Sequence, residues 1–178
     1  MKKYKTGLVL GRFQTFHNGH EYIINKALEI CDKVLVFIGS SDKFGTIENP
    51  FSYELRKKLI KKIYENEIVE NKLVISPLAD LGAGNVTKWG DYLFCEAEKI
   101  LGKVDCIVYG EESKCKSWFS EKIKKSVNFI VISRDDIKIN ASTLRKYMQE
   151  NNFEKWKKFI NEKNWDEFEK MREILIGI

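Results

Sequence analysis

The segment that decides the fold is residues 7–20, which read Gly-Leu-Val-Leu-Gly-Arg-Phe-Gln-Thr-Phe-His-Asn-Gly-His. Its first four residues have the character of a short buried strand, and the residues after it show apolar positions at helical spacing. The chain contains only two histidines, His17 and His20, and both stand at this strand-to-helix turn. Because free backbone N–H groups at a helix N-terminus bind phosphate favourably, the segment indicates a nucleotide phosphate site.

The imidazole pair suits phosphate chemistry. A phosphorus atom under attack gains negative charge, and histidine donates hydrogen bonds while remaining tunable near neutral pH. Gly19 permits close approach of the backbone, and Arg12 adds positive charge beside the pair. An isolated His-x-x-His is more often two unrelated surface or core residues. The preceding strand, the following helix and Arg12 favour the functional interpretation here.

Short apolar runs alternate with helical patterns along the chain. Strands are expected near residues 6–10, 33–38, 72–76, 104–109 and 128–132. Helices are expected near 19–31, 51–65, 86–101, 114–124, 142–149 and 153–171. Continuously apolar strands are typical of a parallel sheet covered on both faces. The prediction is an α/β fold, a Rossmann-like parallel sheet of about five strands with helices on both faces and a C-terminal helical segment.

Composition and length fit one soluble globular unit. The 178 residues are 43% hydrophobic and 32% charged, with a formal charge of +5. We expect a single domain over residues 1–178, with its core in 1–150 and a helical extension in 151–178. The mild positive charge agrees with an anionic substrate and equally with a lysine-rich surface. The aromatic residues of the extension predict packing, and contact within a homo-oligomer is the less favoured role: Trp156, Phe159, Trp165 and Phe168.

The cysteines and the apolar runs indicate the cellular compartment of the protein. Cys31 and Cys106 stand in apolar surroundings that indicate buried free thiols, and Cys95 and Cys115 complete no metal-binding spacing. The apolar run before Gly11 is too short for a signal peptide, and no run approaches the length of a membrane span. We therefore expect a cytoplasmic protein without membrane or nucleic-acid partners.

A second segment of interest follows the last expected strand, at residues 139–145, Ile-Asn-Ala-Ser-Thr-Leu-Arg. Its hydroxyl and N–H groups open a helix, where an anion could sit, and Arg145 could reach the same phosphates. Ser142 and Thr143 taken alone are most often a helix cap, and an exposed arginine is usually solvated. The segment gains weight because loops leaving neighbouring parallel strands can grip one triphosphate from two sides.

These motifs resemble the nucleotidyltransferases of the His-x-Gly-His superfamily, and most closely the archaeal type of nicotinamide-mononucleotide (NMN) adenylyltransferase. The resemblance spans roughly residues 6–150, although Thr15 replaces the usual proline and Asn140-Ala141-Ser142 is a loosened form of the last motif. Its further elements are Gly39-Ser40-Ser41, then Glu48-Asn49-Pro50-Phe51 with Arg56 in the next helix, and 142–145.

The resemblance implies adenylyl transfer from ATP, with Mg²⁺ delivered by the nucleotide, to a mononucleotide. It gives His17, His20, Arg12 and Arg145 catalytic roles and requires no dedicated metal ligand. It implies ATP contacts at Gly11, Phe13, Gln14, Gly19, Gly110, Ser142 and Thr143. It implies acceptor contacts at Ser40, Asn49, Arg56, Asn85 and Trp89, in which Asn85 reads the carboxamide of nicotinamide and Trp89 stacks on its ring.

The acceptor pair has a second interpretation. The family's usual spacing between these two residues is one shorter than that from Asn85 to Trp89, and Gly82 and Gly84 enlarge the loop. An N-cap asparagine and a core tryptophan fit the same residues equally well. The sequence leaves open which acceptor is used and whether it carries nicotinamide or nicotinate.

Three alternatives to this function remain. Cytidylyl or adenylyl transfer to another phosphorylated acceptor uses the same phosphate groups, although Gln14 replaces the acidic residue common in cytidylyltransferases. An ATP-dependent ligase needs additional domains that 178 residues hardly accommodate. A non-catalytic nucleotide sensor would not need His17, His20, Arg12 and Arg145 together, and release of pyrophosphate distinguishes an enzyme from a sensor.

Overall fold

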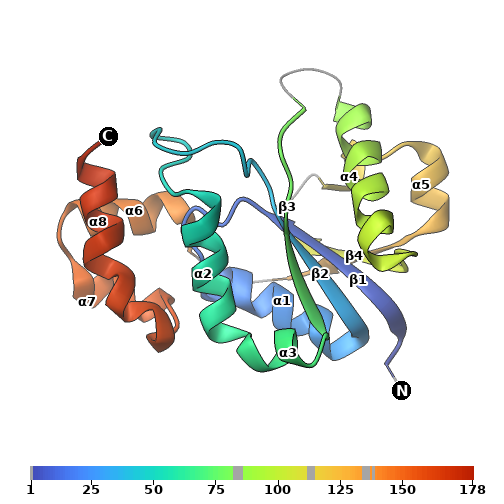
Figure 1. The fold of residues 1–178 in the computed structure, drawn as a ribbon, viewed down its shortest axis with the longest axis horizontal. Helices are drawn as coiled ribbons and strands as arrows, with labels where there is room; N and C mark the ends of the chain where they lie inside the picture. Colours follow the sequence, from blue (N-terminus) through green and yellow to red (C-terminus); the bar gives the residue numbers. More distant parts are fainter. Residues whose placement is uncertain (1, 82–85, 112–114, 134–136, 138) are drawn as a thin grey trace.

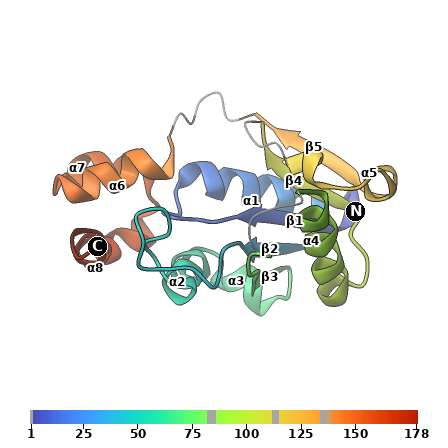
Figure 2. The same ribbon diagram turned by 90° about the horizontal axis from the view of Figure 1, so that it is seen from above.

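The computed structural model describes residues 2–81, 86–111, 115–133, 137 and 139–178. Within these residues, five strands alternate with helices in chain order. Figures 1 and 2 show how these elements are arranged. The strands are β1 (Tyr4–Gly11), β2 (Cys31–Ile38), β3 (Leu73–Pro77), β4 (Cys106–Gly110) and β5 (Asn128–Ile132). The α-helices are α1 (Asn18–Ile30), α2 (Tyr53–Ile63), α3 (Glu65–Val69), α4 (Val86–Leu101), α5 (Glu121–Ser126), α6 (Ala141–Gln149), α7 (Phe153–Trp156) and α8 (Phe168–Ile176). The described residues also form three 3₁₀ segments: η1 (Cys115–Trp118), η2 (Lys157–Phe159) and η3 (Glu162–Glu167).

The five strands form one parallel sheet in the order β3-β2-β1-β4-β5. Gly11 at the end of β1 lies opposite Ile38 at the end of β2. From β1 the chain adds β2 and β3 on one side of the sheet. It then crosses back and adds β4 and β5 on the other side of β1. The expected five-strand parallel sheet is confirmed. Its topology puts the ligand crevice at the carboxyl ends of β1 and β4, the switch point of the sheet.

Alternate side chains of the central strands enter two separate cores. Val34, Val36 and Ile38 of β2 pack with residues of α1 and α2, whereas Leu35 and Phe37 pack with residues of α4 and α5. All five of these side chains are at most 1% exposed. Burial on both faces explains why the strand sequence is continuously apolar rather than alternating.

The region expected as one helix over 114–124 is divided. Here η1 ends at Trp118, and α5 begins at Glu121. Phe119 between them is 1% exposed and is buried in the core, while Ser120 adopts extended backbone as the N-cap of α5. The chain therefore breaks the helix at this point and buries the side chain of Phe119 in the core.

The prediction of one continuous helix over 153–171 is also wrong. The chain forms α7, η2, η3 and α8 instead, with Ile160 in extended conformation between η2 and η3. Asn161 caps the next turn, because its side chain accepts a hydrogen bond from the backbone N–H of Lys163. An asparagine side chain competes for backbone groups in this way and favours helix starts.

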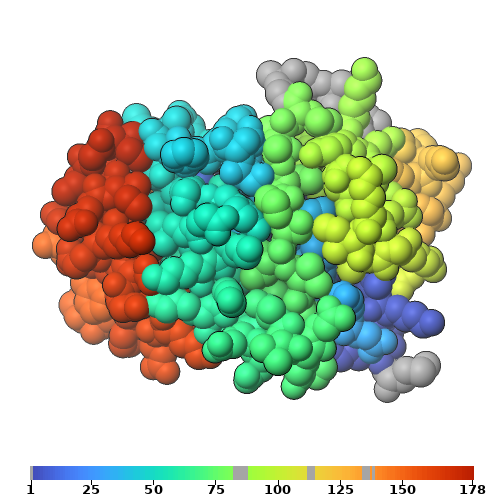
Figure 3. Space-filling view, viewed as in Figure 1, coloured from blue at the N-terminus to red at the C-terminus, as the bar shows by residue number. Residues whose placement is uncertain are grey.

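The extension packs as the aromatic residues predicted. Trp156 and Phe168 are at most 3% exposed, with ring centroids 5.1 Å apart, and Phe159 is partly buried. Trp165 lies nearer the surface, with 38% of its area exposed. α6, α7 and α8 lie together at one end of the molecule, beside α2 (Figures 1 and 2). In the space-filling view the extension and the region of α2 form one continuous surface (Figure 3).

A buried carboxylate joins the extension to α2. Glu167 lies 2.5 Å from Lys58 Nζ and 3.0 Å from Lys62 Nζ, and its side chain is 4% exposed. Burial, the largest single influence, raises the pKa of Glu167, but hydrogen bonds and attraction from Lys58 and Lys62 together outweigh it and lower the pKa. The carboxylate is therefore the stable form of Glu167 in the folded protein.

Glu167→Gln should lower the free energy of unfolding by about 1 to 3 kcal/mol at pH 7, because hydrogen bonds to charged groups are lost. A pKa lowered by folding contributes stability above the unfolded pKa, near 4.3, and the contribution disappears as pH falls through the folded value. Urea unfolding at pH 7 and at pH 3 should therefore show a difference from wild type that shrinks on acidification. Glu173→Gln, on the exposed face of α8, is the control. A pH-independent difference would contradict the ion-pair account.

The cysteine thiols and the length of the helices can also be compared with the sequence predictions. Cys31 and Cys106 are free, buried thiols, as expected, and their Sγ atoms lie 3.4 Å apart. Within the described part of the chain, no helix has both the length and the apolar character needed to cross a membrane.

Candidate active site

The turn between β1 and α1 brings the two histidines together. His17 is the N-cap of α1, and its Nδ1 accepts a hydrogen bond of 3.1 Å from the backbone N–H of Gly19. The rings of His17 and His20 lie nearly parallel, with centroids 3.7 Å apart and 26° between their planes. Because Nδ1 of His17 accepts this bond, a neutral imidazole carries its proton on Nε2. His17 therefore caps the helix with one nitrogen and has a donor on the other.

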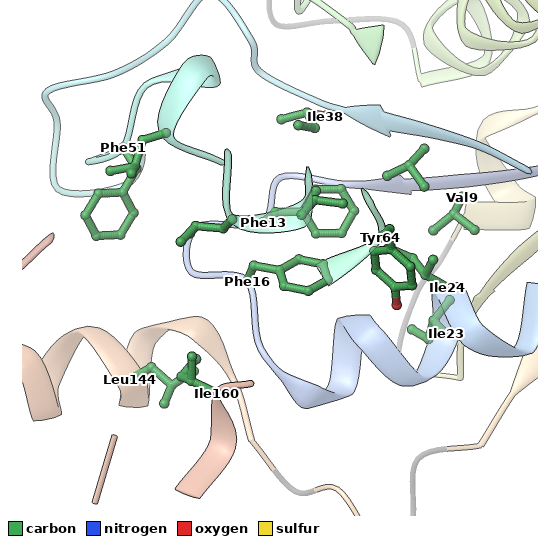
Figure 4. Packing of buried hydrophobic residues seen from close by; sticks show 14 of the residues in the cluster. Val9, Phe13, Phe16, Ile23, Ile24, Ile38, Phe51, Tyr64, Leu144 and Ile160 are labelled. Atoms are coloured by element: carbon green, nitrogen blue, oxygen red, sulfur yellow. The ribbon is translucent and has the colours of Figure 1, made fainter. Parts of the chain in front are cut away.

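His20 is held by aromatic neighbours. Its ring meets Phe13 edge-on at 4.9 Å and lies 5.7 Å from the ring of Phe16. Phe13 and Phe16 are each 2% exposed, and both belong to the core beneath the turn, as Figure 4 shows. Such packing fixes the plane of the imidazole before any substrate binds.

Two residues with expected ATP contacts have buried side chains. Phe13 adopts a positive φ of 53° and turns its ring into the core. Gln14, 3% exposed, donates from Nε2 to Phe51 O at 3.1 Å and accepts from Phe51 N–H at 2.9 Å. This two-way bond attaches the turn to the segment before α2. The side chains of Phe13 and Gln14 organise the turn, and only their backbone groups remain for a nucleotide.

Two arginines bring positive charge to the turn. Arg145 of α6 donates through Nη1 to the backbone oxygen of Gln14 and through Nη2 to Ser142 Oγ at 3.3 Å. Burial lowers the pKa of Arg145, and the charge of Arg12 lowers it further. Arg12 directly follows β1, and Arg145 bonds to the turn at Gln14, so both residues add positive charge to the region of the turn. That region is attractive to an anion.

The N-terminus of α6 approaches the same turn. Its N-cap is Asn140, whose Oδ1 accepts from the backbone N–H of Thr143 at 2.8 Å. Ser142 and Thr143 therefore lie in the first turn rather than at the cap, and Ser142 is exposed. Gly19 is buried in the first turn of α1, and Gly110 is the buried last residue of β4. The fold thus gathers the expected phosphate-binding segments at the carboxyl edge of the sheet.

A pocket of about 310 Å³ opens beside the turn. It is lined by Leu10, Gly11, Arg12, Gly39, Ser40, Asp80, Trp89 and Trp118. Four of these residues were expected at the site from the sequence: Gly11, Arg12, Ser40 and Trp89. The pocket therefore shares Gly11 and Arg12 with the expected phosphate site.

Two expected acceptor residues do not line this pocket. Asn49 is 8% exposed and lies in a turn, where its N–H donates to Thr46 Oγ1 at 3.1 Å. Arg56 is fully buried in α2. Asn85 lies outside the described residues.

Arg56 instead holds the loops that form the pocket. Its guanidinium donates to the backbone oxygens of Ser52 at 3.2 Å, Arg12 at 2.9 Å, Gly39 at 2.8 Å and Ser40 at 3.0 Å. Burial, assisted by the charge of Arg12, lowers the pKa of Arg56 to about 10. The expectation of a direct acceptor contact is replaced by a positioning role.

Asp80 and Trp118 are pocket residues that were missed from the sequence. Asp80 accepts from Ser40 Oγ at 3.0 Å and pairs with Lys43 Nζ at 2.6 Å. Burial is the largest influence on Asp80 and raises its pKa, but Lys43 and Ser40 outweigh burial and lower the pKa. Asp80 lies three residues after the end of β3, and that place near a strand end was the available signal. Trp118 is the last residue of η1, at a distance from β4 at which no such signal is available from the sequence.

Comparison with known proteins agrees with this geometry. The family model described as cytidylyltransferase-like matches residues 8–169. A nicotinamide-nucleotide adenylyltransferase of Thermococcus kodakarensis is 30% identical over 159 residues, which cover 88% of this chain and 78% of that protein. Another from Thermoplasma acidophilum is 31% identical over 121 residues, 68% of this chain and 63% of its own length.

One similar solved structure is that of a bifunctional NMN adenylyltransferase/ADP ribose pyrophosphatase from Francisella tularensis, complexed with AMP and a manganese ion. It superposes with a TM-score of 0.74 at 27% identity, covering 98% of this chain. The present chain spans about half of that longer protein, 52% of its length. With the sheet order, the histidine turn and the family match in agreement, the chain belongs to the cytidylyltransferase-like family.

Proposed function

We propose that this protein is a nicotinamide-nucleotide adenylyltransferase, which joins the AMP moiety of MgATP to NMN and releases pyrophosphate. The observation that carries the proposal is the pocket with Trp89 in its wall, joined through Gly11 and Arg12 to the histidine turn. A mononucleotide whose phosphate binds near Arg12 would place its base in the pocket. An oxygen of that phosphate would then face the triphosphate of ATP. The similarity to archaeal enzymes of that name supports the same acceptor.

In the proposed reaction, a phosphate oxygen of the mononucleotide attacks the α-phosphorus of ATP in line. The bond between the α-phosphorus and the oxygen bridging to the β-phosphate breaks, and pyrophosphate leaves with the electron pair. Nε2–H of His17 and the imidazole of His20 stabilise charge on the α-phosphate, while Arg12 and Arg145 neutralise the departing pyrophosphate. Catalysis is then positioning and electrostatics, without a covalent intermediate.

The metal ion enters as part of the substrate. Mg²⁺ binds phosphate oxygens and usually retains most of its waters. Divalent metal use is supported by the manganese ion in the related structure with AMP. Arg12 and Arg145 add positive charge near the histidine turn, which suits the phosphates of a triphosphate that brings its own metal ion.

The remaining residues have supporting roles in this proposal. Residues 1–178 act as one domain, and the extension supports α1 and α2 rather than touching substrate. The Nδ2 atom of Asn161 in the extension donates to Glu21 Oε1 at 3.0 Å, and that of Asn164 donates to Leu59 O at 3.0 Å. ATP and a mononucleotide are the expected partners.

An acceptor panel tests the proposal. The protein is incubated with MgATP or MgCTP and, in separate reactions, NMN, nicotinate mononucleotide, pantetheine phosphate, a polyol phosphate and flavin mononucleotide. Mass spectrometry should detect NAD⁺ from ATP and NMN at the highest rate, with an equal amount of pyrophosphate. A faster reaction with a non-pyridine acceptor, or with CTP, would identify a different transferase. Nucleotide binding without any pyrophosphate would indicate a sensor.

A further inference from the structure

Two buried cysteines meet at the central strand of the sheet. Cys31 begins β2 and Cys106 begins β4, and these two strands flank β1 on either side (Figure 1). Both side chains are 0% exposed, and their Sγ atoms lie 3.4 Å apart. The pair stands at the amino end of the sheet, whereas the candidate active site lies at the carboxyl end. None of the roles described above uses these thiols.

Gly7 of β1 leaves the space that the thiols occupy. A Cβ at this position would lie 2.5 Å from Sγ of Cys31 and 3.6 Å from Sγ of Cys106. Glycine weakens the interior of a strand and marks places where another group approaches closely. At Gly7 that group is the thiol of Cys31, which lies directly against the backbone of β1.

The two thiols differ in acidity. The hydrogen bond between them lowers the pKa of Cys31, and the nearby charge of Lys2 lowers it further, although burial opposes both. The same hydrogen bond, together with burial, raises the pKa of Cys106. Because the thiolate is the reactive form of cysteine, Cys31 is the sulfur that an oxidant attacks first, with Cys106 beside it to resolve the product.

The pair is buried but lies close to the surface along the chain. Asp32, which follows Cys31, is exposed, and Asp105, which precedes Cys106, is partly exposed. The Nζ atom of Lys2 donates to the backbone oxygen of Cys31 at 2.9 Å, so the N-terminal segment lies against this cysteine. Terminal segments open locally at little cost in free energy. Such opening gives an oxidant of the size of hydrogen peroxide access to the thiols.

We propose that Cys31 and Cys106 are a redox-sensitive pair, which peroxide converts in the folded protein into a disulfide that links β2 to β4 over Gly7. The two cysteines are 75 residues apart in sequence, so the disulfide closes a long loop. A crosslink of this kind stabilises a protein mainly by restricting its unfolded state. The oxidised protein therefore resists unfolding better than the reduced one. This inference concerns stability and does not depend on the proposed transferase function.

The oxidation has two steps. The thiolate of Cys31 attacks one oxygen of hydrogen peroxide, the O–O bond breaks, and the sulfur becomes a sulfenic acid while the other oxygen leaves as hydroxide and is protonated to water. The sulfur of Cys106 then attacks the sulfur of Cys31. The S–O bond breaks, and the proton of the Cys106 thiol leaves with the oxygen as a second water. In sum, two thiols are oxidised to one disulfide, and one peroxide is reduced to two waters.

The test uses the Cys95→Ser protein as parent, because Cys95 is the exposed cysteine and could crosslink two molecules. The folded parent is treated with hydrogen peroxide, catalase ends the reaction, and free thiols are blocked with N-ethylmaleimide in urea. Peptide mass spectrometry should find the peptides of Cys31 and Cys106 joined and lighter by two hydrogen atoms. The melting temperature should rise by about 5 °C or more and return to the reduced value with dithiothreitol.

Three variants of the parent serve as controls. Cys31→Ala and Cys106→Ala should show neither the joined peptides nor the rise in melting temperature. Cys115→Ala removes another buried thiol and should respond as the parent does. If either variant of the pair fails to fold, the joined peptides and the melting temperature of the parent still decide the question.

Gly7→Ala tests the packing on which the pair depends. Its Cβ displaces the Cys31 thiol, so the melting temperature should fall and most of the crosslink should be lost. In Gly7→Ala/Cys31→Ala the sulfur that this Cβ would meet is gone, and part of the lost melting temperature should return. If nothing returns, the close contact between Gly7 and Cys31 is overturned as the reason for the pairing.

Four results of the oxidation would overturn the inference. The first is a parent protein in which both thiols remain free after peroxide treatment. The second is a disulfide that forms only when urea is present during oxidation, or one that involves Cys115. The third is a sulfinic or sulfonic acid at Cys31 without a disulfide. The fourth is a disulfide between Cys31 and Cys106 that leaves the melting temperature unchanged or lowers it.

Discussion

Replacing His17 by asparagine should lower turnover by about 10² or more, while the protein remains folded. Asparagine is among the best N-cap residues, so its side-chain oxygen can replace Nδ1 as the acceptor for the N–H of Gly19. It has no group in the place of Nε2–H, the donor assigned to the α-phosphate. The change therefore removes the catalytic hydrogen bond and retains the helix cap.

His17→Ala provides the comparison, because it removes the cap as well. It should lose about 1 kcal/mol more of the free energy of unfolding than His17→Asn, with turnover reduced at least as far. Steady-state kinetics and urea unfolding of both variants check the assignment. Turnover of His17→Asn within threefold of wild type would show that His17 is only a cap.

Arg56→Met should destabilise the protein by about 4 kcal/mol or more, because several backbone oxygens lose a buried donor at about 1 to 3 kcal/mol each. The guanidinium contacts oxygens of Arg12, Gly39 and Ser40, which belong to the loops after β1 and β2. Arg56→Lys should recover little of the loss, since one ammonium group cannot reproduce the planar fork. The KM for the acceptor should rise in any fraction that stays folded, because these loops line the pocket.

Lys61→Met is the control, since Lys61 is exposed on the same helix. Urea unfolding at one pH gives the difference in free energy, and the melting temperature of Arg56→Met should fall by roughly 10 °C or more. A loss no larger than that of Lys61→Met would contradict the positioning role. An intact fold with a raised KM would return Arg56 to direct contact with substrate.

The sheet could be predicted from the sequence because its strands are buried on both faces. Continuous apolar runs such as Val34 to Ile38 have few other interpretations, and their alternation with helical patterns determines a parallel order. The extension could not be predicted at the same level. Its apolar residues fit a single helix by spacing, but side-chain caps at Asn152 and Asn161 and the extended Ile160 divide it. Such local competition depends on tertiary contacts that spacing does not contain.

The same distinction applies to the candidate site, where some residues are visible in sequence patterns and others are placed by tertiary packing. His17, His20, Arg12 and Trp89 could be proposed from the sequence because each lies close to a strand end or a helix start, and their roles stay predictions. Arg56 was expected in contact with the acceptor, because its charge is visible in the sequence and its burial is not. Trp118 was missed because its place in the pocket arises from tertiary packing, far from the histidine turn in sequence.

The central claim is adenylyl transfer to NMN, and isotope tracing tests it most directly. The protein is incubated with NMN and MgATP labelled with ³²P at the α-phosphorus, and in a parallel reaction at the γ-phosphorus. The account predicts that the α-label appears in NAD⁺ and the γ-label in pyrophosphate, in equal amounts. An α-label that remains in ATP, or appears in AMP without entering a dinucleotide, would contradict it.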